Sequence, residues 1–420
     1  MANIPTEPVL DSTLGLLRDG YQFIGRRCDR LQSDIFQTRL RLEKTICMRG
    51  AAAAEVFYDP EKFSRQNAAP KRVQKTLVGE GGVQGLDGAA HRQRKQIFMA
   101  LMTPERLQQL SDLTLHHCRQ YAQRWQGQPQ VVLFEQVNEI LCRAVCAWSG
   151  VPLAEAEVAQ RTLELAAMID GVGNLGFRYV QGVQARKRVE AWIAAVIEQV
   201  RASQLSAPDK TAIAAFAHHR DDQGRLLDTH AAAVDVINVL RPTVAIGRYI
   251  VFAALALHQH PDCYLKLKAN EDNYRTLFVQ EVRRFYPFFP FAAARIKEEF
   301  DWQEYHFPKN TLVLLDLYGT NHDSDRWQEP EKFWPERFSH WSENAFDFIP
   351  QGGGDYQKNH RCAGEWLTIK LMDQVLDFLV NELEYDVPPQ QLEVKLSRMP
   401  TIPASGFIIN NVKLNTEAQY

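Results

Sequence analysis

One cysteine stands in a context that suits iron chemistry. Cys362 follows the glycine-rich run Phe-Ile-Pro-Gln-Gly-Gly-Gly-Asp-Tyr-Gln-Lys-Asn-His-Arg and precedes Ala-Gly-Glu. Apolar residues then recur at helical spacing from Leu367 to Leu379, which predicts a helix that begins just after the cysteine. The backbone N–H groups and the positive end of such a helix favour thiolate over thiol. A thiolate held in this way can bind iron.

A haem-thiolate centre needs small residues beside the sulfur so that the porphyrin can lie close. Gly352, Gly353, Gly354 and Gly364 supply that room. The alternative is a buried structural cysteine beside a helix start, which is the usual state of a lone cysteine. The local run leaves both interpretations open.

Three motifs elsewhere in the chain accompany this cysteine. Glu281-Val-Arg-Arg places a glutamate and an arginine three residues apart, on one helix face. Pro335-Glu-Arg-Phe lies in a loop upstream of Cys362, and Phe285-Tyr-Pro-Phe-Phe-Pro-Phe-Ala-Ala-Ala-Arg breaks a helix at a proline and ends in an arginine. Together with the cysteine run, these motifs resemble the cytochrome P-450 superfamily over most of the chain.

The resemblance implies a fold and several residue roles. The fold is a mainly α cytochrome P-450 domain, a triangular helical body with small β-sheets that encloses haem b, and residues 1–420 form one such domain. The sulfur of Cys362 is the axial ligand of the haem iron. Arg295 reaches a haem propionate. A buried structural lock is formed by Glu281, Arg284 and Arg337.

A long apolar segment, Ala231–Leu257, carries charge in its middle. A membrane span hardly tolerates Arg241 and Arg248, so we expect a core helix. A buried guanidinium costs several kcal/mol unless an anion pairs with it, and Pro242 removes a backbone N–H and kinks the helix. Either an internal carboxylate or, if haem is present, an anion beside the iron should therefore pair with Arg241.

The Arg241-Pro242 pair resembles one subgroup of the superfamily, the fatty-acid peroxygenases, which match the chain from Thr38 to Val412. In ordinary members an acid and a threonine at this place pass protons to iron-bound dioxygen. The subgroup implies hydroxylation of long-chain fatty acids at the α or β carbon by hydrogen peroxide, without a redox partner protein. Arg241 binds the carboxylate of the substrate, which then serves as the acid–base group.

A glycine-containing block before a helix adds further candidates. By the resemblance, His91, Lys95 and Arg65 contact a haem propionate, although an exposed His-Lys pair would have no such role. Gln84 matches a distal-pocket position that holds either Gln or His, and the His form goes with decarboxylation to terminal alkenes. Because glutamine cannot donate the proton that a histidine could supply for decarboxylation, Gln84 favours hydroxylation.

Side chains near the substrate decide which carbon reacts. Val78 falls at a position that faces the first carbons of the substrate, and an aliphatic residue there resembles the α-selective type, unless Val78 only packs the wall. Phe288 and Phe289 are expected to line the substrate tunnel with other scattered apolar residues. We therefore expect α more than β hydroxylation.

Composition agrees with this interpretation. A formal charge of −3 and a pI near 6.5 give no electrostatic reason to expect nucleic-acid binding. The first residues lack the apolar run of a signal peptide or anchor, so we expect a cytoplasmic enzyme. The seven cysteines form no CxxC pair, and Cys142 and Cys146, one helical turn apart, are expected to pack in the core.

The periodicity predicts mostly helix. Helical apolar spacing covers Pro104–Trp125, Leu133–Trp148, Glu155–Ile169, Val183–Arg201, Thr229–Leu257, Tyr274–Tyr286 and Glu365–Leu383. Alternating patterns predict an early hairpin over Leu40–Met48 and strands at Thr311–Leu315, Leu392–Leu396 and Phe407–Leu414.

Three other functions remain open on the sequence. A peroxide-driven decarboxylase that forms terminal alkenes would use the same anchoring residues. A reductase-dependent monooxygenase would need a redox partner, which Arg241-Pro242 argues against. A haem sensor or fatty-acid carrier would bind both molecules without turnover.

Overall fold

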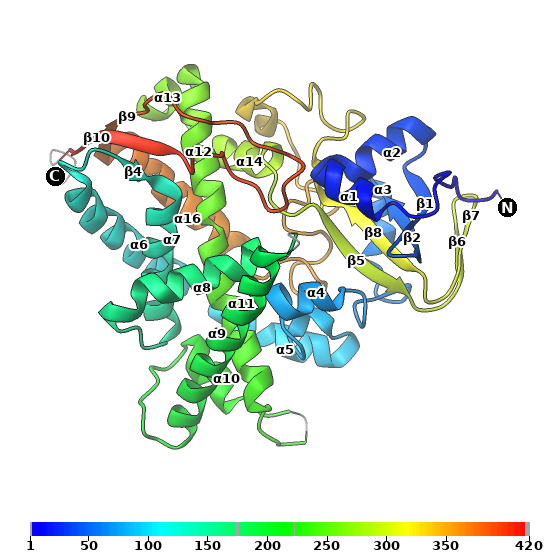
Figure 1. The fold of residues 1–420 in the computed structure, drawn as a ribbon, viewed down its shortest axis with the longest axis horizontal. Coiled ribbons are helices and arrows are strands. Elements are labelled where there is room, and N and C mark those ends of the chain that lie inside the picture. Colours follow the sequence, from blue (N-terminus) through cyan, green and yellow to red (C-terminus); the bar gives the residue numbers. More distant parts are fainter. Residues whose placement is uncertain (1, 174–175, 222, 416–420) are drawn as a thin grey trace.

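The computed structural model describes residues 2–173, 176–221 and 223–415. Helices dominate the left and centre of the view in Figure 1, and the larger sheet lies towards the N-terminal end. The α-helices are α1 (Thr13–Asp19), α2 (Phe23–Leu31), α3 (Ala51–Phe57), α4 (Lys71–Val73), α5 (Gly88–Leu101), α6 (Pro104–Trp125), α7 (Leu133–Ser149), α8 (Val158–Asp170), α9 (Phe177–Arg201), α10 (Ala212–His218), α11 (Thr229–Ala245), α12 (Gly247–Gln259), α13 (Pro261–Lys268), α14 (Tyr274–Phe285), α15 (Leu317–Asn321) and α16 (Glu365–Asp377). Short 3₁₀ or π turns are η1 (Gly20–Gln22), η2 (Gln74–Val78), η3 (Val83–Gly85), η4 (Glu155–Glu157), η5 (Pro335–Ser339) and η6 (Phe378–Glu382).

The strands form small sheets. They are β1 (Ile35–Leu40), β2 (Glu43–Met48), β3 (Phe63–Ser64), β4 (Val131–Val132), β5 (Phe291–Ile296), β6 (Phe300–Trp302), β7 (Tyr305–Phe307), β8 (Leu312–Asp316), β9 (Leu383–Asp386) and β10 (Ile408–Leu414). One sheet has the order β1-β2-β8-β5-β3, with only the β2–β8 pair parallel. A second sheet has the order β4-β10-β9, and β6 pairs with β7. The expected fold, mainly α with small sheets, is confirmed.

Most expected elements are present, and one is wrong. The early hairpin forms with Leu40 opposite Glu43, and strands occupy the expected places at β8 and β10. The segment 392–396 is not a strand, because Val394 makes only an isolated bridge to Pro403. Prolines on both sides of this segment, at 388, 389, 400 and 403, lack the N–H groups that a ladder needs.

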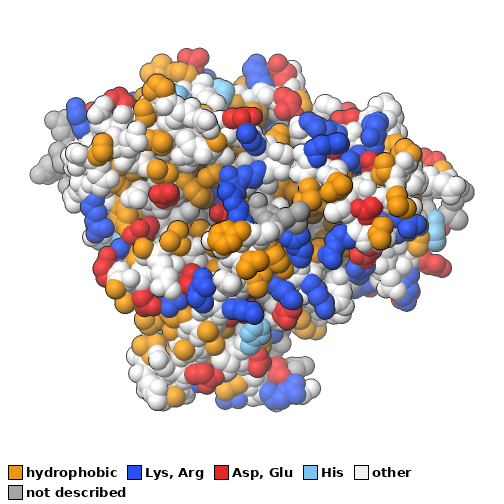
Figure 2. Space-filling view, viewed as in Figure 1, with side chains coloured by type: hydrophobic (Ala, Val, Ile, Leu, Met, Phe, Trp, Pro, Cys, Tyr) orange, Lys and Arg blue, Asp and Glu red, His pale blue; other side chains and the backbone are white. Residues whose placement is uncertain are grey.

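The long apolar helix is a core element. Within the described residues, Thr229–Gln259 is the stretch long and apolar enough to cross a membrane by length and composition, but 94% of its most apolar window is buried inside the protein. It is divided at Ile246 into α11 and α12, and α11 packs on α7 and α9. The same core buries Cys142 and Cys146 of α7 completely. On the face drawn in Figure 2, basic and acidic side chains are interspersed.

Candidate functional site

Cys362 lies in the loop that leads into α16, and its sulfur has polar neighbours. The backbone N–H of Cys362 donates to the Gln351 carbonyl at 3.1 Å, and the side-chain Nε2 of Gln351 lies 3.8 Å from Sγ. The backbone N–H of Gly364 also hydrogen-bonds to the sulfur. The loop therefore aims two N–H donors at Sγ, which is how proteins temper a thiolate ligand.

A buried ion-pair chain fixes the Gln351 amide. Arg283 on α14 donates to Glu365 Oε1 at 2.6 Å and to Gln351 Oε1 at 3.2 Å. Arg361 donates to the other oxygen of Glu365 at 2.6 Å. Because Oε1 of Gln351 accepts from a guanidinium, its NH₂ group is the end that faces Sγ.

The helix start does not by itself favour the thiolate. Burial raises the pKa of the Cys362 thiol, and this effect outweighs the hydrogen bond from Gly364. The helix α16 begins only at Glu365, three residues beyond the sulfur. The expectation that the helix start favours thiolate over thiol is therefore not supported by the buried position of this sulfur.

The structure brings Glu281, Arg284 and Arg337 together. Nε of Arg284 donates to Glu281 at 2.8 Å, and Nε of Arg337 lies 3.2 Å from the same carboxylate. The backbone N–H of Trp334 adds a third contact at 2.8 Å. Glu281 and Arg284 are fully buried, so this cluster ties α14 to the loop that precedes the cysteine run.

Arg241 on α11 is a buried guanidinium. Its side chain is 6% exposed, and among the described residues no carboxylate forms an ion pair with it. Its NH2 donates to Asn238 Oδ1 at 3.4 Å, while Nε has no hydrogen-bond partner in this part of the chain. Burial, followed by the charge of Arg186, lowers the pKa of Arg241 to about 9, and the charge of Cys362 acts the other way. Of the two partners expected from the sequence, the internal carboxylate is not found among the described residues.

Asn238 connects Arg241 to the predicted distal residues. Its Nδ2 donates to Gln84 Oε1 at 3.0 Å and to the Val78 carbonyl at 3.0 Å. A side chain at Gly82 would lie only 3.0 Å from this Nδ2, so Gly82 permits the contact. We did not single out Asn238 from the sequence, although its position one helical turn before Arg241 could have indicated it.

Apolar side chains collect on the same side of α11. Leu77, Ile169 and Ala245 are buried together, and the partly buried residues packed against them are Val73, Val78, Val172 and Phe288. The Phe288 ring stacks on Tyr249 at 4.2 Å. Phe289 is 42% exposed and lies outside this group, so the structure does not support its expected place in the tunnel wall.

A donor-rich cluster lies beside the cysteine loop. The His91 ring stacks on His360 with centroids 3.9 Å apart, and Lys95 donates to the Arg361 carbonyl at 3.0 Å. Nε2 of His360 lies 3.8 Å from the Asp87 carboxylate. Burial lowers the pKa of His91 to about 3 and that of Lys95 to about 8. His360 was not singled out from the sequence, although it stands two residues before Cys362.

The two expected propionate arginines differ in position. Arg65 is 8% exposed, donates to the Ala293 carbonyl at 2.7 Å, and lies over the Phe57 ring. Its charge lowers the pKa of both His91 and His360, so it lies beside the donor-rich cluster. Arg295 is instead held by Glu43 at 2.7 Å and by the carbonyls of Asn67 and Asn310. The expectation for Arg295 is therefore not supported, because its guanidinium is already engaged at the sheet edge.

These residues fit a haem group on three grounds. Sγ of Cys362 faces two N–H donors, and the nearest contact of a side chain placed at Gly364 would be this sulfur at 3.9 Å. The cluster around His91 combines the neutral imidazoles of His91 and His360 with the cations Lys95 and Arg65, and N–H donors of this kind bind carboxylates such as propionates. Arg241 on α11 lies near enough to Cys362 for a thiolate there to raise its pKa.

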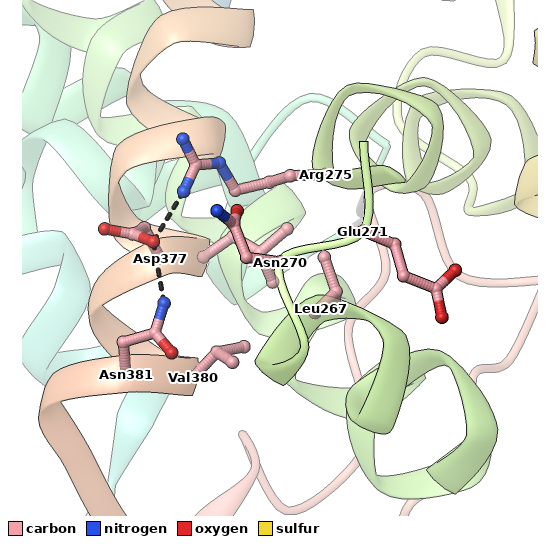
Figure 3. Close-up of a pocket in the computed structure, with 8 residues that line it drawn as sticks. Leu267, Asn270, Glu271, Arg275, Asp377, Val380 and Asn381 are labelled. Atoms are coloured by element: carbon pink, nitrogen blue, oxygen red, sulfur yellow. Dashed lines mark hydrogen bonds and ion pairs between the residues drawn. The ribbon is translucent and has the colours of Figure 1, made fainter. Parts of the chain in front are cut away.

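A small surface cavity elsewhere has no part in this site. Figure 3 shows Arg275, Asp377 and Asn381 beside this space, which lies between α13, α14 and α16. The volume of the space is about 10 Å³. That volume holds about one water, and Arg275 is already paired with Asp373 and Asp377. The cavity therefore offers no place for an organic substrate.

Comparison with known proteins decides the family. A family model described as Cytochrome P450 matches residues 181–413. The chain belongs to the cytochrome P450 family. Among curated relatives of this P450, taxoid 14-beta-hydroxylase from Taxus cuspidata is 24% identical over 92% of this chain and 82% of its own length. Putative cytochrome P450 120 from Synechocystis sp. is 23% identical over 94% and 92%.

Solved P450 structures are more similar. Cytochrome P450EX alpha (CYP152N1) with myristic acid is 48% identical, with a TM-score of 0.96 over 99% of this chain and 100% of that chain. Cytochrome P450SP alpha (CYP152B1), solved as a mutant, is 47% identical, with a TM-score of 0.95 over 96% and 99%. A variant of cytochrome P450 OleT in complex with arachidonic acid is 35% identical, with a TM-score of 0.96 over 99% and 100%. The resemblance indicated by the sequence is confirmed.

Proposed function

We propose that this P450 hydroxylates long-chain fatty acids at the α carbon, and to a lesser extent at the β carbon, with hydrogen peroxide as the oxidant. The proposal includes a cytoplasmic enzyme that needs no redox partner protein. One observation carries it: Arg241 is a buried guanidinium without an acid partner among the described residues, near enough to Cys362 for a thiolate there to raise its pKa. The structures of P450EX alpha with myristic acid and of OleT with arachidonic acid support a fatty acid as the missing anion.

Arg241 binds the carboxylate of the substrate. Its guanidinium can donate two parallel hydrogen bonds, which fixes the direction of the acid as well as its position. The alkyl chain then lies against the apolar group around Val78 and Phe288. Anchoring the carboxylate leaves the first carbons of the chain nearest to the Cys362 side of the site, which accounts for α and β products.

The bound carboxylate also moves a proton. Once held by Arg241, it can accept a proton from one oxygen of hydrogen peroxide and return it to the other. The side-chain amide of Asn238 accepts from Arg241 and donates to Gln84. Pro242 contributes no N–H to α11, which leaves the Asn238 carbonyl without its helical partner beside the arginine.

Haem b, bound through Cys362, supplies the iron centre that activates the peroxide. For this group we propose propionate contacts from His91, Lys95 and Arg65, and we add His360. Gln351 and Gly364 donate to the sulfur and limit its electron donation. Glu281, Arg284 and Arg337 tie α14 to the segment that precedes the cysteine run.

Product analysis tests this function. Purified holoenzyme is given a saturated long-chain fatty acid and hydrogen peroxide without reductase or nicotinamide, and the products are identified by mass spectrometry. We expect 2-hydroxy acid to exceed 3-hydroxy acid. Predominant alkene one carbon shorter would replace the proposal with a decarboxylase. Turnover that needs a reductase and survives catalase would instead indicate a reductase-dependent monooxygenase. Ligand binding without turnover would indicate a carrier.

A further inference from the structure

A second buried arginine lies behind the turn that carries Val78. Arg186 on α9 is 2% exposed and is among the largest fully buried side chains. We propose that Arg186 is a positioning residue that fixes the turn from Leu77 to Gly79 and thereby decides which carbon of the fatty acid is hydroxylated. The inference rests on the proposed function and adds a determinant of its regiochemistry.

Arg186 holds the turn through its backbone. NH1 of Arg186 donates to the Leu77 carbonyl at 2.9 Å, and Nε donates to Glu190 Oε1 at 2.6 Å. Its NH2 has no hydrogen-bond partner among the described residues. A guanidinium is rigid and planar, so the contact with Glu190 sets the direction in which NH1 holds the Leu77 carbonyl.

Gly79 leaves room for this guanidinium. A Cβ placed on Gly79 would lie 2.0 Å from NH2 of Arg186 and 2.6 Å from Cγ1 of Val234. Gly79 also has a φ of +81°, a conformation that side chains rarely adopt. The arginine therefore occupies the space that any other residue at this position would need.

The same turn is also bonded to Asn238, which accepts a hydrogen bond from the carboxylate anchor Arg241. The Val78 carbonyl accepts from Asn238 Nδ2 at 3.0 Å, and Asn238 Oδ1 accepts from Arg241 at 3.4 Å. The turn that carries Val78 is thus bonded to Arg186 at the Leu77 carbonyl and, through Asn238, to Arg241. Because the side chain of Val78 packs against the buried group of Leu77, Ile169 and Ala245, small movements of this turn change how the first carbons of an anchored acid are placed.

The charge of Arg186 has a second effect. It is the largest cause after burial that lowers the pKa of Arg241, so the two guanidinium groups repel each other. A bound carboxylate relieves that repulsion, whereas a neutral ligand does not. Arg186 therefore also favours an anionic substrate at Arg241.

Two substitutions at Arg186 separate its geometry from its charge. Arg186→Lys keeps the charge but loses the planar fork, and Arg186→Gln loses both. For each variant the ratio of 2-hydroxy to 3-hydroxy acid is measured, with the dissociation constant of the fatty acid from a spectral titration. We expect the ratio to fall at least about fivefold in both variants, as for one lost hydrogen bond. Only Arg186→Gln should also raise the dissociation constant of the fatty acid, because only this variant loses the charge.

Gly79→Ala tests the same contact with Arg186 intact. Its new methyl group displaces the guanidinium, so the product ratio should fall as in Arg186→Lys. Arg188→Gln is the matched control, because Arg188 lies on the same helix, is 52% exposed and pairs with Glu164. It should keep the wild-type ratio.

Variants of Arg186 and Gly79 that retain the haem-thiolate spectrum and the wild-type product ratio would overturn the role of Arg186 while leaving the proposed function intact. A wild-type enzyme that oxidises no fatty acid with peroxide would overturn the proposed function, and this inference with it. If Arg186→Gln does not fold, Arg186→Lys and Gly79→Ala decide the matter.

Discussion

Arg241 is costly for the protein to keep in the absence of a ligand. A guanidinium that is 94% removed from solvent and has no carboxylate partner in the described chain loses hydration that its contact with Asn238 replaces only in part. Such a cost is acceptable where a ligand supplies the missing charge. We therefore expect Arg241 to contribute most to binding when the apolar side chains around the site have already removed water from the carboxylate of the substrate.

Arg241→Ala should abolish fatty-acid binding and peroxide-driven turnover together, because both depend on the same ion pair. Loss of one partner of a buried charge pair costs about 2–5 kcal/mol, so the dissociation constant should rise at least about 30-fold. A spectral titration with fatty acid measures it. Arg241→Lys keeps the charge without the planar fork, so its dissociation constant for the fatty acid should lie between those of the wild type and Arg241→Ala. Unchanged turnover in Arg241→Ala, with normal haem content, would contradict the carboxylate anchor.

Gln84→His should increase the yield of terminal alkene. Gln84 Oε1 accepts from Asn238, and a histidine nitrogen can accept the same hydrogen bond while its other nitrogen carries a proton that glutamine cannot supply. Alkene and hydroxy acid are compared by gas chromatography after reaction with peroxide. Gln84→Glu is the control, since it keeps the length of the side chain. An unchanged product distribution in Gln84→His would show that this position does not choose between the two reactions.

At the scale of elements, two buried ion-pair clusters connect α14 to the segments before and after the cysteine loop. One joins Glu281 to Arg284 and Arg337, and the other joins Arg283 to Glu365 at the start of α16. Neighbouring arginines of one helix thus serve two different segments. The sulfur is placed by α14 as much as by the helix that follows it.

Glu281→Gln should destabilise the fold strongly, because two buried guanidinium groups then lose their shared carboxylate. Breaking a buried pair by removing one partner costs about 3–5 kcal/mol. Urea unfolding and retention of the haem-thiolate spectrum measure the effect. Glu329→Gln is a suitable control, since Glu329 lies near the same loop and forms an exposed pair with Lys332, for which less than about 1 kcal/mol is expected. Equal midpoints for both variants would contradict a structural role for the cluster.

The sequence predicts elements better than it predicts tertiary neighbours. Long periodic helices such as α6 and α11 follow from apolar spacing, whereas the supposed strand at 392–396 has the right alternation but no partner strand. Cys362 and Arg241 were found because each stands in a recognisable motif. Arg186 and Asn238 have no such motif, and they matter only because folding brings the turn at Leu77–Gly79 between α9 and α11.

At the scale of the whole molecule, charge is buried in places that serve no substrate. Asp316 at the end of β8 is 1% exposed and caps α15 by accepting from the Gly319 N–H at 2.7 Å. Burial raises the pKa of Asp316 to about 7. The protonation of Asp316 therefore makes the free energy of unfolding depend on pH, independently of the haem site.

Asp316→Asn should raise the free energy of unfolding near pH 8 and leave it almost unchanged near pH 4. In the unfolded chain an aspartate loses its proton near pH 4, whereas folded Asp316 keeps it until about pH 7. Between these values the folded state holds the extra proton, so this group makes stability fall as pH rises, by up to about 1.4 kcal/mol per unit. Asparagine removes that dependence and still caps the helix. Urea unfolding of both proteins from pH 4.5 to 8 measures the difference, with exposed Asp112→Asn as the control. Parallel curves for wild type and Asp316→Asn would show that Asp316 is ionised throughout this range.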